Sequence, residues 1–218
     1  MQARLMSSAA SVAAPMRHKV AVILSGCGVY DGSETHETSA VLVHLSRNGA
    51  EPIMYAPDVD QMHVVNHTKG EPHARIARGN VADISNLKPM DMDAVVFPGG
   101  FGVAKNLLCC IAPILAAKVL PNVDITLGHD KDDGSGNWPF ADAAQAAISM
   151  GANHHNCNVL DAENVPFCFS LMIFHEIVID EKNLLVTTPA FMYGAGKFHE
   201  IHDGVGNMIT ALIKLIKT

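Results

Sequence analysis

The sequence predicts a single α/β domain in which a mostly parallel β-sheet carries helices on both faces. The first reason is a set of continuous apolar runs, such as residues 19–25, which are typical of strands buried on both sides. The second is that these runs alternate with segments of helical periodicity, as in parallel α/β sheets. The third is size, because 218 residues with 49% hydrophobic residues suffice for one domain with a sizeable core.

The first unit of this fold is a strand, a glycine-rich loop and a helix. The strand is expected over residues 19–25 and the helix over residues 36–50. Asp31 or Ser33 is expected to cap the start of the helix, because short polar side chains accept hydrogen bonds from its free N–H groups. Gly49 is expected to end the helix, since glycine readily adopts the left-handed conformation that closes many helices.

The remaining elements continue the alternation of strands and helices. Further strands are expected at 51–58, 93–100, 123–130, 158–160 and 184–191. Further helices are expected at 113–120, 140–151 and 206–217, with residues 198–204 as the entry to the last one.

Composition excludes several classes of protein. The formal net charge of −7 comes without a basic stripe, which argues against a nucleic-acid partner. No apolar run approaches the ~20 residues that a membrane-spanning helix needs. The five cysteines form no C-x-x-C pair, so neither a disulfide framework nor a zinc ribbon is indicated. We therefore expect no membrane partner, no metal and no cofactor.

Residues 1–18 differ in composition from the rest of the chain. This segment is rich in serine and alanine, it carries Arg4 and Arg17, and the first acidic residue of the chain is Asp31. Arginine and serine without acids are typical of a mitochondrial transit segment. We expect a mitochondrial protein whose single domain covers residues 19–218; a short tail without a targeting role is the alternative.

Several motifs, in this order, resemble one known family. They are "ILSGCGVYDGSETHE" (23–37), "FPGGFGVAKNL" (97–107), "CCIAPILAAKVL" (109–120) and "LVTTPAFM" (185–192). The chain resembles the PfpI-like superfamily of class I glutamine amidotransferase-like proteins, in the branch of the bacterial enhancing-lycopene-biosynthesis proteins (ElbB-like) and their vertebrate mitochondrial relatives. The resemblance implies a flavodoxin-like sandwich, often a homodimer, and glyoxalase-type activity on small carbonyl compounds as in bacterial members.

The same resemblance assigns roles to particular residues. Cys110 matches the family nucleophile and Cys109 its less critical neighbour. A helix beginning near Pro113 supports this role, because a helix N-terminus can lower the pKa of a thiol. The alternative is a buried structural cysteine, which is the usual state of a free cysteine.

The other site residues also follow from the resemblance. Glu37 matches the acid that hydrogen-bonds the nucleophile; the alternative is an acid that merely complements the helix dipole. Gly99 and Gly100 match the turn whose N–H groups face a developing oxyanion, although Pro-Gly-Gly alone indicates only a turn. His129 is a candidate second acid–base group. No His-Pro-Glu follows the cysteine as in true glutaminases, so glutamine hydrolysis is not supported.

The chain departs from its family around the nucleophile. Relatives carry a helix and a strand between the Pro-Gly-Gly turn and the cysteine, whereas nine residues separate Gly100 from Cys110 here. A parallel crossover needs at least ~10–12 residues. A smaller gap lies before residues 74–79, and residues 164–174 have no counterpart in the family. Exon skipping and intron read-through, in a splice form or a mistaken gene model, would explain missing and added blocks with clean boundaries. Genuine divergence of the sequence is the alternative.

Two functions therefore remain open. The first is a mitochondrial enzyme that uses Cys110, Glu37 and the Gly99–Gly100 turn in glyoxalase- or hydrolase-like chemistry, with impaired turnover because the fold is incomplete around the nucleophile. The second is a non-catalytic binding or redox-responsive protein, or a defective splice form.

Overall fold

The computed structural model describes residues 17–26, 32–59, 76–77, 79–106, 112–157 and 177–217. Its main sheet consists of four parallel strands in the order β3-β2-β1-β4. They are β1 Lys19–Ile23, β2 Glu51–Ala56, β3 Val81–Asp83 and β4 Ala94–Val96. The predicted mostly parallel α/β fold is confirmed.

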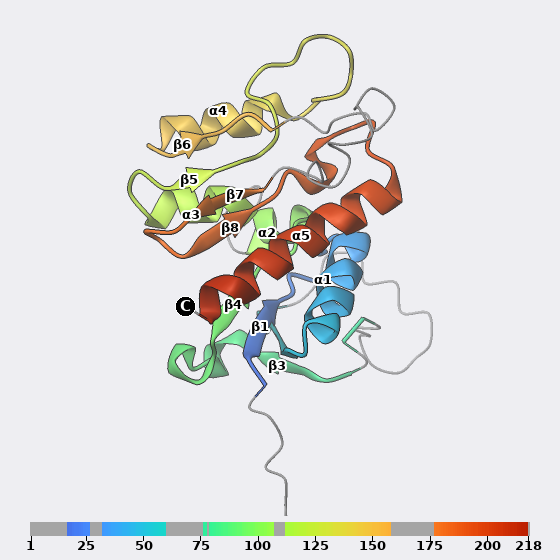
Figure 1. Ribbon diagram of the computed structural model, residues 1–218, viewed down its shortest axis with the longest axis vertical. Coiled ribbons are helices and arrows are strands. Elements are labelled where there is room, and N and C mark those ends of the chain that lie inside the picture. The colour runs from blue at the N-terminus through green and yellow to red at the C-terminus, as the bar shows by residue number, and fades with distance from the viewer. Residues whose placement is uncertain are drawn as a thin grey trace, which may run out of the picture.

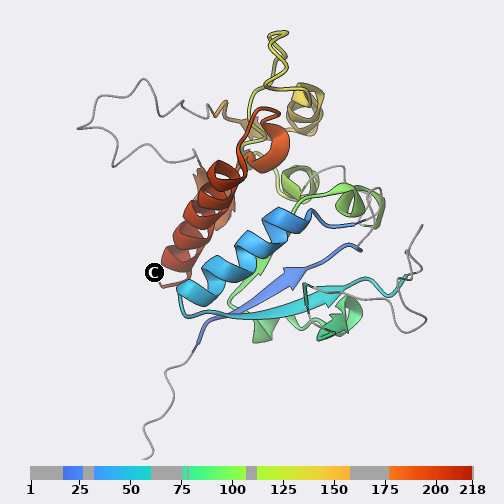
Figure 2. The same cartoon turned by 90° about the vertical axis from the view of Figure 1, so that its right-hand side faces the viewer.

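Two helices cover one face of this sheet. Helix α1 Thr35–Arg47 and helix α5 Phe198–Ile216 lie side by side along it, as Figure 1 shows from the front and Figure 2 from the side. Apolar side chains from both helices and from the strands form one continuous cluster, which hydrophobic burial stabilises. Its fully buried members include Val20, Val22, Val41, Leu45, Val205, Ile209 and Ile213.

The opposite face of the sheet is covered by tighter turns. The 3-10 segments η1 Ile84–Asn86 and η2 Pro89–Asp91 precede β4. Ile84 and nearby apolar residues pack there against the buried Ala21 and Ile23 of β1. Because a strand's successive side chains point to opposite faces, β1 is buried on both sides, as its apolar run predicts.

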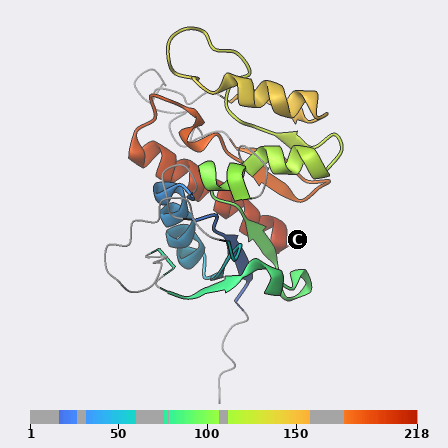
Figure 3. The same ribbon diagram turned by 180° about the vertical axis from the view of Figure 1, so that it is seen from behind.

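The C-terminal half is built on two smaller sheets. Its strands are β5 Asp124–Ile125, parallel to β6 Asn153–His154, and β7 Val178–Asp180, antiparallel to β8 Leu185–Thr187. Its helices are α3 Ala112–Val119 and α4 Ala141–Ser149, which share a core with β5. Figure 3 shows α3 and the short helix α2 (Phe101–Asn106) on the side of the molecule away from α5.

The main sheet ends at β4 within the part of the chain that the structure describes. After β4 the chain turns at Gly99 and Gly100 into the short helix α2 Phe101–Asn106. The described strands of the C-terminal half pair with one another and not with β4. The described strands therefore form three separate sheets, the main one and two smaller ones.

Several expected boundaries differ from the observed ones. The strand expected at 123–130 has only two residues in ladder pairing, and α5 begins at Phe198. The short strands β3, β6 and β7 were not predicted. Short strands have too few residues for a periodic signal. The strand expected at 158–160, the insertion at 164–174 and the cap candidate Asp31 lie outside the described residues. No described helix is long and apolar enough to cross a membrane.

Candidate functional site

Two loops meet where β1 and β4 end. The N–H of Glu34 donates to the carbonyl of Gly99 at 2.8 Å, and the N–H of Gly102 donates to the carbonyl of Gly32 at 2.9 Å. Because β1 and β4 are parallel neighbours, both loops leave the same edge of the sheet. This carboxyl edge is where open α/β sheets bind ligands.

Glu37 projects from the first turn of α1 toward this meeting point. Its Oε2 accepts a hydrogen bond of 2.7 Å from the N–H of Gly99, and its Oε1 lies 3.5 Å from the N–H of Phe191. The second contact is long and weak. The carboxyl group thus joins three segments that are far apart in sequence: the start of α1, the turn after β4 and the turn after β8.

The surroundings of Glu37 favour its neutral form. The residue is only partly exposed, and burial of its carboxyl group raises the pKa from 4.5 to about 7. The bond from Gly99 works against this rise, whereas the negative charge of Glu34 adds to it. A carboxyl group with this pKa exchanges a proton near neutral pH, which suits general acid–base chemistry.

The turn after β4 requires glycine at both positions. A Cβ on Gly99 would lie 2.8 Å from Glu37 Oε2, so a side chain would displace the carboxyl group. Gly100 has φ +114°, and its Cβ would lie 2.5 Å from the backbone of Gly32 and Glu34. Glycine alone accepts that conformation and that close approach. The Pro-Gly-Gly signal therefore reflects contact between two backbones as well as a turn.

The two glycines differ in the hydrogen bonds that they offer. The N–H of Gly99, one of the two predicted oxyanion donors, is engaged by Glu37. Gly100 is then the remaining predicted donor of this turn.

Glu34 is a site residue that the sequence reasoning missed. It stands at the N-cap of α1, and its Oε2 accepts a hydrogen bond from the N–H of Glu37 at 2.6 Å. The predicted cap Ser33 uses its hydroxyl differently, as the acceptor for the N–H of Ser25 at 2.8 Å. Serine leads the N-cap preference while glutamate does not, so the cap signal favoured the wrong residue.

Phe191 was also missed, because it acts through its backbone. It lies in the 3-10 segment η4 Ala190–Met192, directly after β8 and Pro189. The preceding Ala190 has φ +48°, an uncommon conformation for a residue other than glycine. Such strain is concentrated at functional sites, and here it directs the Phe191 N–H toward Glu37.

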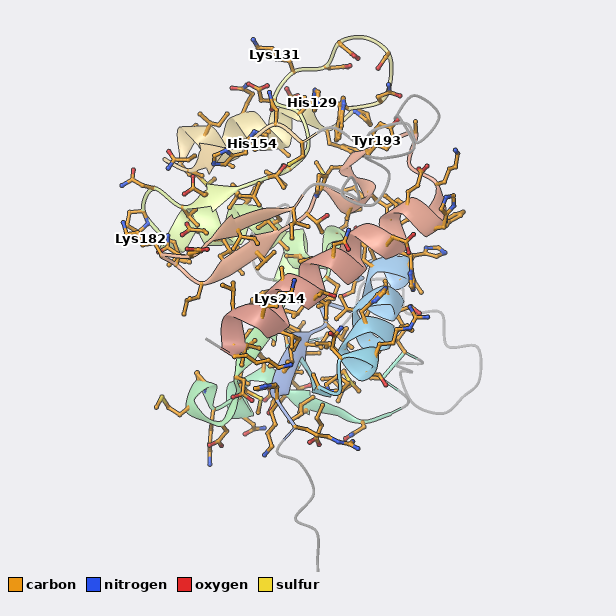
Figure 4. All side chains as sticks on the ribbon, in the orientation of Figure 1. His129, Lys131, His154, Lys182, Tyr193 and Lys214 are labelled. Carbon is orange, nitrogen blue, oxygen red and sulfur yellow. The ribbon has the colours of Figure 1, made fainter. Side chains whose placement is uncertain are left out.

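His129 lies near the same segment but contacts other residues. It follows β5, and its ring stacks on the buried Trp138 with centroids 4.5 Å apart and planes 9° from parallel. Trp138 in turn packs against Tyr193, which directly follows η4. Figure 4 shows His129 and Tyr193 together in the upper part of the molecule, with Lys214 on α5 well below them. His129 thus belongs to an aromatic cluster with Trp138 and Tyr193. Tyr193 follows the η4 segment whose Phe191 N–H approaches Glu37, so η4 lies between His129 and Glu37 in this chain of contacts.

The predicted nucleophile is not among the residues that the structure describes. Cys109 and Cys110 fall between helices α2 and α3, outside the described ranges. Cys157, which follows β6, is buried. Within the described ranges no group of three or more His, Cys, Asp or Glu side chains is arranged to hold a metal ion.

Three animal proteins align with most of this chain. The chain is 44% identical over 239 aligned positions to a human protein named glutamine amidotransferase-like class 1 domain-containing protein 3, mitochondrial, covering 90% of this chain and 83% of that protein. It is 43% identical to the rat ES1 protein homolog, mitochondrial, with 91% and 84% covered. A zebrafish protein named ES1 protein, mitochondrial, is 33% identical, with 90% and 85% covered.

Solved structures agree on the fold. A crystal structure described as an isoprenoid biosynthesis protein with amidotransferase-like domain, from Ehrlichia chaffeensis, superposes with a TM-score of 0.66 at 26% identity, covering 91% of this chain and 99% of that one. The 24 kDa rapid encystment protein of Francisella tularensis shares the fold at a TM-score of 0.54 and 9% identity, with 89% and 99% covered. No protein-family model matches the sequence.

These relatives confirm the expected mitochondrial localisation and the expected internal gaps relative to the family. The three named animal proteins are mitochondrial, which confirms the expected localisation. The alignment to the human protein extends over 239 positions, more than the 218 residues of this chain, so that protein has residues without a counterpart here. From the shared sequence, the shared fold and the carboxyl edge built around Glu37, this mitochondrial chain belongs to the family of glutamine amidotransferase-like class 1 domain proteins, also named ES1.

Proposed function

We propose that this protein carries the site of a cysteine-dependent glyoxalase- or hydrolase-like enzyme for small carbonyl compounds, with impaired turnover in this chain. Cys110 is the nucleophile, Glu37 exchanges a proton with the thiol or the substrate oxygen, and the N–H of Gly100 faces the developing oxyanion. His129, beside the aromatic cluster, is a candidate second acid–base group.

The observation that carries this proposal is the protonatable carboxyl of Glu37 at the Gly99–Gly100 turn. A carboxyl with a pKa of about 7 is present in both protonation states at neutral pH. It can hydrogen-bond a thiol as a donor and then accept a proton without a large energetic penalty. A carboxylate that merely complemented the helix dipole would not require desolvation or a bond to the Gly99 N–H.

The impaired turnover is inferred from the short connection between the Gly99–Gly100 turn and Cys110. The main sheet ends at β4 among the described strands, and nine residues connect Gly100 to Cys110. That connection is too short for a parallel crossover of at least ~10–12 residues. A connection that cannot reach a parallel strand beside β4 would hold the thiol less firmly against Glu37, and misplacement by about 1 Å can reduce the rate about 10²-fold.

The test is turnover of methylglyoxal and phenylglyoxal, measured with Cys110→Ser, Glu37→Gln and, as a matched control, Cys157→Ser. We expect slow turnover that Cys110→Ser and Glu37→Gln abolish and that Cys157→Ser leaves unchanged. Insertion of a relative's helix and strand between Leu108 and Cys109 should raise the rate. High turnover by the unmodified chain would contradict the impairment, and activity that survives Cys110→Ser would contradict the nucleophile.

A second candidate function is a non-catalytic, redox-responsive protein. The observation that favours it is that the described strands after β4 pair with one another and not with β4, while the nine residues between Gly100 and Cys110 are too few for a parallel crossover. A Cys110 that reacts with peroxide or iodoacetamide, in a protein that turns over no dicarbonyl even after the insertion, would favour this candidate.

A further inference from the structure

We propose that Glu34 is a positioning residue for this site: its peptide group and its carboxylate together fix where Glu37 stands against the Gly99–Gly100 turn. The inference rests on the role proposed for Glu37, but it concerns a different residue that no family resemblance assigns. It is carried by hydrogen bonds that Glu34 makes in three directions.

The backbone of Glu34 holds the turn and the helix together. Its N–H donates to the carbonyl of Gly99 at 2.8 Å, so the turn cannot move away from α1 without losing this bond. Its carbonyl accepts from the N–H of Thr38 at 3.0 Å and from the hydroxyl of Thr38 at 2.6 Å. Because Thr38 is fully buried, the Glu34 peptide is anchored to the core of the protein.

The carboxylate of Glu34 then sets the orientation of the first turn of α1. Its Oε2 accepts from the N–H of Glu37 at 2.6 Å, and its Oε1 lies 3.1 Å from Nδ1 of His36. The carboxylate side chain is 27% exposed, so these bonds form in a partly desolvated place. One residue therefore binds both the backbone of Glu37 and the backbone of Gly99, which itself binds the Glu37 carboxyl.

The charge of Glu34 gives this arrangement a chemical consequence. The negative charge lies close to the carboxyl of Glu37 and disfavours a second negative charge there. It thereby adds to the burial that raises the pKa of Glu37. A residue that only capped the helix would need the acceptor oxygen but not the charge, so the two roles can be separated by experiment.

The experiment titrates Glu37 directly by NMR in protein labelled with ¹³C at the glutamate carboxyl carbons, with the Glu37 signal assigned by its loss in Glu37→Gln. In Glu34→Gln the acceptor oxygen remains and the charge is removed. We expect the Glu37 midpoint to fall by about half a pKa unit, a roughly threefold change in its ionisation constant. The matched control is Glu51→Gln, which removes an exposed carboxylate on β2 and should leave the midpoint unchanged.

A second variant tests the positioning itself. Glu34→Ala removes the cap, and we expect Tm to fall by about 2–4 °C, as for the loss of one cap in a protein of this size. At a pH well below the Glu37 midpoint, where this carboxyl is neutral in every variant, the amide proton of Gly99 should move toward the shift of a weaker hydrogen bond in Glu34→Ala and stay in place in Glu34→Gln. Glu34→Asp keeps the charge with a shorter reach, so it should retain the raised midpoint more fully than Glu34→Gln.

The outcomes separate this inference from the proposed function. A Glu37 midpoint that does not move in Glu34→Gln, or a Gly99 amide unchanged in Glu34→Ala, would overturn the role of Glu34. If both change as expected while the alkylation rate of Cys110 has the same pH profile in every variant, Glu34 positions Glu37 and the proposed coupling of Glu37 to the thiol is wrong.

Discussion

The two ends of helix α1 differ in their contacts: the first end contacts a backbone turn, and the other end contacts a side chain of α5. At its start, the carboxyl of Glu37 is held by the backbone N–H of Gly99, in a turn where the three atoms nearest to a Cβ on Gly100 would all be backbone atoms. At its other end, Nε2 of His44 lies 3.3 Å from Nδ1 of His202 on α5. A Cβ on Gly206 would lie 2.5 Å from Cε1 of the His44 ring, which is too close for an ordinary contact.

The comparison teaches that burial shifts the pKa values of the titratable groups at the two ends in opposite directions. Burial raises the pKa of Glu37 to about 7, because desolvation penalises the charged carboxylate. Burial also lowers the pKa of His44, and the positive charges of His202 and Arg47 lower it further, while Asp203 opposes them. Burial thus favours the neutral form of both groups, but the contribution of Glu37 to stability is lost as pH rises, whereas that of His44 is lost as pH falls.

The largest effect is expected from a side chain in the turn at the start of α1. Gly100→Ala should reduce the free energy of unfolding by about 4 kcal/mol, as strain at positive φ and overpacking add together. The matched control is Gly134→Ala, which also has positive φ but has no atom within 4 Å of its Cβ position. Urea unfolding should show a much smaller loss in the control; equal losses would mean that the contact between the two loops contributes little.

The next effect concerns the charge of Glu37. The raised folded pKa means that the folded state binds a proton more tightly than the unfolded state, so this contribution to stability is complete below pH 4.5 and is lost as pH rises through about 7. The shift corresponds to about 3 kcal/mol. Glu37→Gln should therefore match the parent near pH 4.5 and exceed its stability by up to that amount at pH 8. A difference between the two proteins that does not change with pH would refute the raised pKa.

A smaller loss is expected at the other end of α1. Gly206→Ala meets the His44 ring, which can rotate away, and alanine is favoured over glycine in a helix by up to about 1 kcal/mol. We expect a net loss of about 1 kcal/mol, since overpacking exceeds this gain. In a His44→Ala background the same substitution should stabilise the protein. A double-mutant cycle without coupling between these positions would contradict the contact.

The smallest effect is the pH dependence of the histidine pair. Because the folded pKa of His44 is lowered, its contribution to stability is present above the unfolded value of 6.5 and is lost as pH falls below it. His44→Asn should reduce the dependence of unfolding on pH between about 7.5 and 5. His199→Asn removes an exposed histidine from α5 and should leave the dependence unchanged; an equal change in both variants would exclude the pair as its source.

Local patterns predicted the elements that hold the site, whereas the family resemblance assigned the roles of Glu37, Gly99 and Gly100. The apolar run of β1 and the Pro-Gly-Gly after β4 identify two loops at one sheet edge, and Glu37 falls in the first turn of a predicted helix. Glu34 and Phe191 were not predictable in this way. Glu34 acts against the usual cap preference, and Phe191 contributes only its N–H, which any residue other than proline possesses.

Apolar periodicity, turn residues and composition determined by themselves the parallel α/β class and the position of α1, and they indicated a mitochondrial protein. Each of these is a local property that neighbouring residues specify together. Only the tertiary structure decided how the described strands after β4 pair with one another and that Glu37 meets both Gly99 and Phe191. The physical reason is that desolvation and hydrogen bonding depend on which distant segments approach one another, so the pKa of Glu37 is a property of the fold and not of the motif around it.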